Sequence, residues 1–115
     1  MKLWIAIVVL MLATVGHAGK AEAGYFSGSD LLGWCESDIV AKQSTCNGYL
    51  AGINDITRAY DNWGVVSQSL CIPDGVTLSQ LAKVAIKGLN EEPEKLHMDA
   101  SSIVYNIFYE AFPCD

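Results

Sequence analysis

The sequence predicts an all-α fold: one small single domain of about four helices, closed by two disulfides. Three observations carry this prediction. Apolar residues recur at three- and four-residue steps through most of the chain, no stretch alternates as a β-strand does, and four cysteines follow an N-terminal apolar segment. A chain of 115 residues is long enough for one domain with its own core, and no internal repeat divides it.

The N-terminal segment has the features of a cleavable signal peptide. Lys2 is its single charge, and an almost uninterrupted apolar run follows from Leu3 to Val15. The run is about a dozen residues long, whereas a membrane-spanning helix needs roughly 20, which disfavours a retained anchor. Small residues then offer two A-x-A-like sites, so we expect cleavage after Ala18 or after Ala23. We favour Ala18, which lies closer to the apolar run.

Cleavage after Ala18 separates a signal peptide, residues 1–18, from a mature domain, residues 19–115. The formal net charge of the whole chain is −6, and either cleavage removes one net positive charge, which makes the mature chain more acidic. Its Lys and Arg residues are scattered singly. Nucleic acids and anionic lipids attract concentrated Lys and Arg, so we expect neither nucleic acid nor, after signal cleavage, a membrane as partner.

Two helices are expected in the first half of the mature domain. Ser29 or Asp30 can N-cap a short helix that ends near Cys35. A long amphipathic helix follows, after a turn or first helical turn at residues 43–45. Its apolar face consists of Cys46, Tyr49, Leu50, Ile53, Ile56, Thr57 and Tyr60.

A loop and two more helices complete the predicted fold. Gly64 and a Pro-Asp-Gly turn at residues 73–75 mark residues 63–76 as a loop. Thr77 and Gln80 form a capping box for the third helix. Pro93 suits the first position of a fourth helix, and Pro113 ends it. The apolar stripe of the fourth helix consists of Leu96, Ala100, Ile103, Val104, Ile107, Phe108 and Ala111.

The cysteines are expected to form disulfides. An even number of cysteines in a short exported chain implies an oxidising compartment. A four-thiolate zinc site usually carries C-x-x-C pairs, which are absent, so we expect no metal. Cys35 ends the first helix and Cys46 begins the second, so a helical hairpin brings them together. Of the three pairings, this layout favours Cys35–Cys46 with Cys71–Cys114.

No set of residues predicts catalysis or a cofactor. His97 is the only histidine outside the signal peptide, and no serine lies in a G-x-S-x-G context. The sequence instead favours a binding module, with its surface at the end of the second helix and in the loop. Trp63 is either an anchor at an interface or a cover for the core. The candidate partner-binding residues are Tyr60, Asp61, Asn62, Trp63, Val65 and Val66.

Several segments, in order along the mature chain, resemble one family. The most specific are the C-x-G-Y-x-x-G-x-x-D block from Cys46 to Asp55 and the terminal Phe-Pro-Cys at residues 112–114. They are accompanied by Leu-Leu-Gly-Trp-Cys at 31–35, Cys-Ile-Pro-Asp-Gly-Val-Thr at 71–77 and Pro-Glu-Lys-Leu-His at 93–97. Together these segments resemble the Rap/Tai immunity proteins of type VI secretion. Gly88 is one departure, because the resemblance leads us to expect a bulky residue there.

The resemblance implies a helical periplasmic protein, commonly a homodimer, that binds and blocks a peptidoglycan amidase effector. Such a blocker acts by stoichiometric binding, so the resemblance agrees with the lack of a catalytic set. The alternative is a periplasmic acid-stress chaperone of the small helical type, which would open at low pH. Two disulfides argue against a protein that must open easily. An enzyme is a distant third hypothesis.

Overall fold

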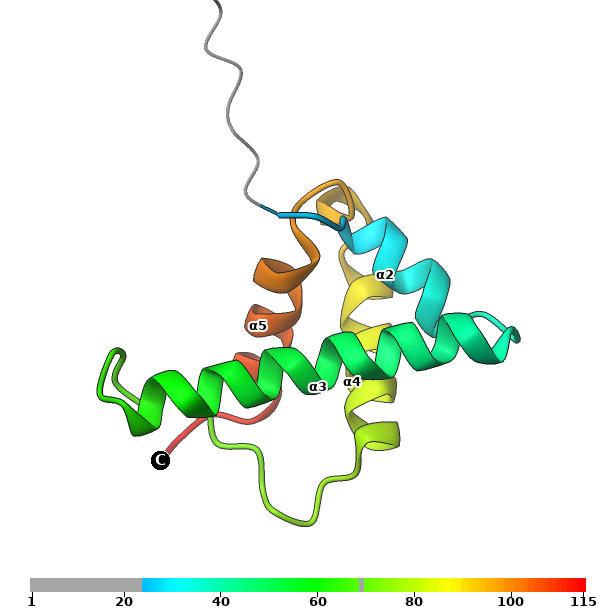
Figure 1. Cartoon of the computed structure of the whole chain (residues 1–115). Helices are drawn as coiled ribbons and strands as arrows, with labels where there is room; N and C mark the ends of the chain where they lie inside the picture. Colours follow the sequence, from blue (N-terminus) through cyan, green and yellow to red (C-terminus); the bar gives the residue numbers. More distant parts are fainter. Residues whose placement is uncertain (1–23, 69) are drawn as a thin grey trace, which may run out of the picture.

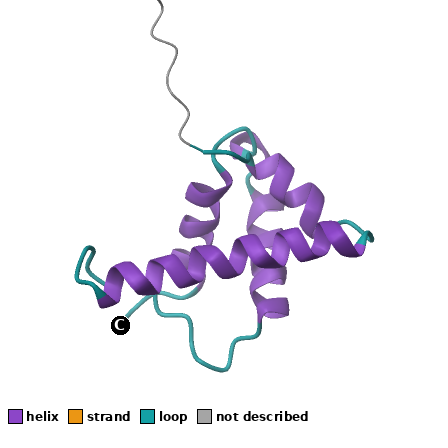
Figure 2. Ribbon diagram, in the orientation of Figure 1, coloured by secondary structure: helices purple, strands orange, loops and turns teal. Residues whose placement is uncertain are grey.

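The computed structural model describes residues 24–68 and 70–115, so the predicted signal peptide lies outside the described residues. Four α-helices and one short 3-10 helix follow one another along this part of the chain: α2 (Gly28–Cys35), α3 (Val40–Asn62), α4 (Leu78–Glu91), η1 (Pro93–Lys95) and α5 (Ala100–Ala111). The long helix α3 crosses α4 and α5, and α2 joins the first part of α3 (Figure 1). The prediction of an all-α domain of four helices is confirmed (Figure 2).

The hydrophobic core lies where the four α-helices meet. Each helix contributes the face that its apolar periodicity predicts, and among the described residues no polar side chain is buried. The buried apolar residues are Leu31 of α2, Cys46 and Leu50 of α3, Leu81, Ala85 and Leu89 of α4, and Ala100, Ile103, Val104 and Phe108 of α5. None of the helices in the described segments is both long and apolar enough to cross a bilayer.

Helix α2 begins two residues earlier than expected. Its N-cap is Ser27, not Ser29 or Asp30. The Ser27 hydroxyl accepts a hydrogen bond from the Asp30 N–H (3.2 Å), and the Asp30 carboxylate accepts one from the Ser27 N–H (2.9 Å). This reciprocal pair is a capping box, and its hydrogen bonds lower the pKa of the Asp30 carboxyl. Asp30 therefore belongs to the box as its third helical residue rather than as the cap itself.

Helix α3 also begins earlier than expected, at Val40, so residues 43–45 form helix rather than a turn. It ends at Asn62, where Gly64 follows with a φ of 68°. The sequence signal was weak at the start because the N-cap, Ile39, makes no side-chain hydrogen bond to the first turn. The predicted end is confirmed.

The expected fourth helix is divided into two pieces. Pro93 begins only the 3-10 helix η1, and α5 does not begin until Ala100. The chain between them bonds instead to the N-terminal segment: Gly28 N–H donates to the Met98 carbonyl (3.0 Å), and Ala100 N–H donates to the Phe26 carbonyl (2.9 Å). These non-local hydrogen bonds replace the intrahelical ones, and a local pattern could not reveal them.

Helix α4 has the predicted capping box and an unpredicted close contact. Gln80 N–H donates to the Thr77 hydroxyl (3.2 Å), and Thr77 N–H donates to the Gln80 side-chain oxygen (2.7 Å). Near the other end, a Cβ at Gly88 would lie 2.6–2.7 Å from side-chain atoms of Ile107 in α5. A glycine is required here because α5 occupies the space of any side chain, which gives this departure from the family pattern a physical reason.

Both predicted disulfides are present. Cys35–Cys46 joins the end of α2 to the first part of α3, and Cys46 is buried in the core. Cys71–Cys114 joins the loop before α4 to the C-terminus. Next to it, Cys71 N–H donates to the Phe112 carbonyl (3.0 Å). The first disulfide therefore belongs to the core, whereas the second anchors a loop.

We predict that Gly88→Ala destabilises the protein. Overpacking against Ile107 costs about 1–3 kcal/mol, which exceeds the gain of up to about 1 kcal/mol in helix propensity. Urea unfolding measures the change. Gly52→Ala in α3 is the matched control, since nothing lies within 4 Å of a Cβ at Gly52. That control is expected to be neutral or stabilising, and a Gly88→Ala variant that behaved like it would contradict the close contact of α4 with α5.

We also predict that the two disulfides stabilise different parts of the protein: Cys71–Cys114 the loop, and Cys35–Cys46 the core. By the chain-entropy model, the separation of 43 residues between Cys71 and Cys114 corresponds to about 4 kcal/mol of stability. Replacing both with serine should lower the thermal midpoint and expose residues 63–77 to limited proteolysis while circular dichroism still reports a folded protein. The paired replacement of Cys35 and Cys46 with alanine is the control, because it should weaken the core without selectively freeing the loop. Equal loop cleavage in both variants would contradict this assignment.

Candidate protein-binding surface

Helix α3 is longer than the helices that it crosses. At about 1.5 Å per residue its 23 residues span roughly 35 Å, whereas the 12 residues of α5 span roughly 18 Å. Its buried residues, Cys46 and Leu50, both lie in its first half. The C-terminal half therefore continues past the core, and its end projects from the rest of the domain (Figure 1).

The predicted apolar face of α3 is packed against the core in one part and exposed to solvent in the other, because the helix continues past the core. Tyr49 and Ile53 are still packed against the core, whereas Ile56 and Tyr60 are exposed by 45% and 43%. The periodicity that predicts burial is the same in both halves. Because α3 runs across α4 and α5 (Figure 1), the place where it crosses them decides which part of the face is covered.

A Schellman turn ends α3 and shapes this projecting end. Gly64 N–H donates to the Asp61 carbonyl (3.0 Å), and Val65 N–H donates to the Tyr60 carbonyl (2.9 Å). This pair of bonds, with Gly64 in the left-handed region, is the Schellman pattern. It fixes the backbone on both sides of Trp63, the C-cap residue, without burying the indole. We refer to residues 60–66 as the α3 tip.

The α3 tip exposes an aromatic and aliphatic cluster. The Trp63 side chain is 69% exposed, and its ring centroid lies 6.1 Å from that of Tyr60. Val65 and Val66 are also exposed. Of the two interpretations of Trp63, the structure therefore excludes a cover for the core. Single exposed apolar residues are ordinary, but a contiguous group of them at a projecting end is typical of an interaction site.

An apolar groove continues from the α3 tip between α3 and α5. It has a volume of about 550 Å³. One wall is formed by α3 side chains and Val66, and small polar residues and a tyrosine of α5 form the other. Its lining residues are Ile53, Ile56, Thr57, Tyr60, Val66, Ser101, Ser102, Tyr105 and Asn106. Tyr105 also stacks on Tyr109 further along α5, with ring centroids 6.4 Å apart.

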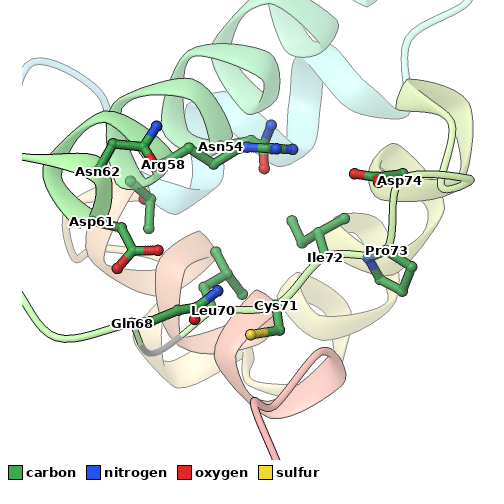
Figure 3. Close-up of a pocket in the computed structure, with 11 residues that line it drawn as sticks. Asn54, Arg58, Asp61, Asn62, Gln68, Leu70, Cys71, Ile72, Pro73 and Asp74 are labelled. Carbon is green, nitrogen blue, oxygen red and sulfur yellow. The ribbon is translucent and has the colours of Figure 1, made fainter.

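A polar pocket lies on the adjacent side of α3, between this helix and the loop, and shares Thr57 with the groove (Figure 3). It has a volume of about 370 Å³. Arg58 and Asp61 face it from α3, and Asp74 reaches toward it from the loop. The loop wall is held by Cys71 and its disulfide. The ion pairs found in residues 24–68 and 70–115, Lys87–Glu91 and Lys95–Glu92, involve none of these three charged groups.

The structure divides the predicted partner-binding residues between two places, and it adds neighbours that the sequence analysis missed. Tyr60, Trp63, Val65 and Val66 form the exposed cluster, whereas Asp61 and Asn62 line the polar pocket. The groove residues of α5 were not predicted, because nothing local in Ser101, Ser102 or Asn106 indicates a site. The periodic tyrosines of α5 were the one available signal.

Nothing in the described segments forms a recognisable catalytic or metal centre. His97 is exposed at the turn before α5, and the carboxylates of the polar pocket have no histidine or nucleophile beside them. The described His, Cys, Asp and Glu residues include no group of three placed to hold a metal ion. All four cysteines are in disulfides.

Comparison with known families places this surface in context. The sequence model of the Rap1a immunity proteins matches residues 27–114, which is most of the chain and includes every helix from α2 to α5. This match confirms the resemblance to Rap/Tai immunity proteins. A comparison with curated proteins found no match. Proteins of the matched family are non-enzymatic inhibitors of a cognate toxin effector, and this role, together with the two disulfides, suggests an extracytoplasmic location.

Proposed function

Because the chain belongs to the family of Rap1a immunity proteins, we propose that it binds and blocks a type VI secretion amidase effector in the periplasm. The effector would cut the peptide stems of peptidoglycan, and this protein would protect the cell that makes it. The observation that carries the proposal is the α3 tip with its adjoining groove. They form an exposed, largely apolar surface on a domain whose family acts by binding a toxin.

Three features support a periplasmic site of action. The N-terminal segment is a predicted signal peptide, and the mature domain carries two disulfides, which persist in oxidising compartments. Peptidoglycan lies in the same compartment, so an inhibitor must be exported to meet an amidase there.

The proposed mechanism is steric exclusion. The α3 tip inserts into the substrate groove of the effector, and the apolar groove beside it accepts an apolar element from the rim of the effector. A well-ordered tip loses little conformational entropy on binding, since the Schellman turn and the Cys71–Cys114 disulfide already restrain both sides of it. Inhibition then needs tight binding and no catalytic group.

The homodimer implied by the family resemblance stays a prediction. Tyr109, which is 49% exposed on α5 and stacked on Tyr105, is a candidate for that contact. The acid-stress chaperone is the less favoured alternative. A chaperone of that type must release apolar surface by opening, and here two disulfides hold α2 to α3 and the loop before α4 to the C-terminus.

We expect the mature protein to inhibit the amidase encoded beside it at near one-to-one stoichiometry. The measurement is the release of peptidoglycan fragments by a fixed amount of effector, titrated with the mature protein at neutral pH. Inhibition that is complete near one equivalent supports the proposal. The absence of inhibition, combined with suppression of client aggregation at low pH, would favour the chaperone.

Trp63→Ala should weaken this inhibition without weakening the fold. Tryptophan anchors at interfaces commonly contribute 2 kcal/mol or more, so the inhibition constant is expected to rise about 30-fold. The thermal midpoint should stay nearly unchanged, because the side chain is 69% exposed. Tyr25→Ala is the matched control, since Tyr25 is a 96% exposed aromatic outside the α3 tip. Equal inhibition by the two variants would contradict the role of the tip.

A further inference from the structure

Gly24, the first residue that the structure describes, lies directly against the side chain of Asp99. A Cβ at Gly24 would lie 2.5 Å from Asp99 Cγ and 3.0 Å from Asp99 Cβ, so the Asp99 side chain occupies the space that a side chain at position 24 would take. The contact is part of the junction in which the N-terminal segment runs antiparallel to the turn before α5. Ser27 and Asp99 form an isolated β-bridge in that junction.

Among the residues that the structure describes, the Asp99 side chain has no hydrogen-bond or ion-pair partner. As the N-cap residue of α5 it would ordinarily accept a hydrogen bond from the first turn, but it makes no side-chain cap bond. Neither of the ion pairs in the described segments includes it. It is half-buried, where an unpaired carboxylate is unfavourable. The titratable neighbour is Tyr49, whose pKa is raised by burial first and by the charge of Asp99 to a smaller extent.

The sequence can supply the missing positive charge by proteolysis. Ala21-Glu22-Ala23, which immediately precedes Gly24, is the second of the two A-x-A-like sites. Hydrolysis of the Ala23–Gly24 peptide bond adds one water and leaves a carboxylate on Ala23 and an α-ammonium on Gly24. Standard backbone geometry puts this nitrogen roughly 2.5 Å from the Cβ position, which overlaps the Asp99 carboxylate. The new charge is therefore within reach of an ion pair.

We infer that this chain is processed between Ala23 and Gly24, and that the α-ammonium of Gly24 then pairs with Asp99. The inference rests on the proposed export of the protein. The inference favours cleavage after Ala23 over cleavage after Ala18, the site that the sequence alone favours. Cleavage after Ala18 would place the new positive charge on Gly19, whereas a charge on Gly24 lies beside Asp99. Maturation then strengthens the junction that joins the start of α2 to the start of α5.

The first test is the N-terminus of the exported protein. The full precursor is expressed with its own N-terminal segment, and intact mass and N-terminal sequencing are measured on the periplasmic fraction. A chain that begins at Gly24 supports the inference, and one that begins at Gly19 overturns it. An uncleaved precursor that stays in the cell would overturn the export proposal as well, so the two failures are distinguishable.

The second test separates the ion pair from other roles of Asp99. Asp99→Asn is compared in two chains, one that begins at Gly24 and one that begins at Gly19. The thermal midpoint should fall by about 2–5 °C in the Gly24 chain and remain nearly unchanged in the Gly19 chain. An equal fall in both chains, or in neither, would overturn the pairing, since a helix-capping role of Asp99 does not depend on where the chain begins.

A direct readout of the same pair is the pKa of the terminal amine. An α-amino group ordinarily titrates near 8, and a neighbouring carboxylate stabilises its charged form. We expect a raised pKa in the Gly24 chain and an ordinary value after Asp99→Asn, measured by NMR on the ¹³C-methylated amine. The same pKa with and without Asp99 would contradict the inference.

Discussion

The crossing of the long helix α3 over α4 and α5 is the constraint on which the rest of the structure depends. Burial of Cys46 and Leu50 fixes the first half of α3 across the core. Because α3 runs across α4 and α5 (Figure 1), these two helices cover about two helix widths, roughly 20 Å, of a helix whose 23 residues span roughly 35 Å. The uncovered half, with the Schellman turn at its end, produces the α3 tip and both depressions that flank it. The candidate binding surface is thus a consequence of helix packing rather than an added loop.

The Cys71–Cys114 disulfide matters because the chain must lead back from the projecting end of α3 to the start of α4. Residues 63–68 and 70–77 lead from the α3 tip back to the start of α4, and these described residues make few backbone hydrogen bonds. Cys71–Cys114 and the hydrogen bond from Cys71 to Phe112 attach this segment to the C-terminus. The same attachment forms one wall of the polar pocket. This attachment depends on an oxidising environment, which is also where the proposed target acts.

Local signals in the sequence predicted most of the elements correctly. Capping residues such as Thr77 and Gln80 mark a helix start through bonds made within one turn, and Gly64 marks a helix end by its backbone freedom. The disulfide pairing followed from the order of helices. In contrast, the break before α5 depends on hydrogen bonds to residues 26–29, which no local pattern records. The requirement for Gly88 depends on Ile107 of another helix in the same way.

The candidate site was predicted in part from the sequence. The parts that were missed depend, like the break before α5, on contacts between segments that are distant in the sequence. Trp63 and its neighbours were identifiable as a helix end rich in aromatic and aliphatic residues. Whether Trp63 faced the core or the solvent could not be decided from the sequence, because the answer depends on where α3 crosses α4 and α5 (Figure 1). The groove wall from α5 was missed since small polar residues such as Ser101 and Asn106 carry no signal of their own.

Hydrogen–deuterium exchange of the mature protein with and without the effector tests the central claim most directly. If the α3 tip and the groove form the inhibitory surface, amides of residues 53–66 and 101–106 should gain protection in the complex. Amides of α2 and of the outer face of α4 should exchange at unchanged rates. Protection concentrated on α2 and α4, with the α3 tip exchanging as in the free protein, would contradict the account.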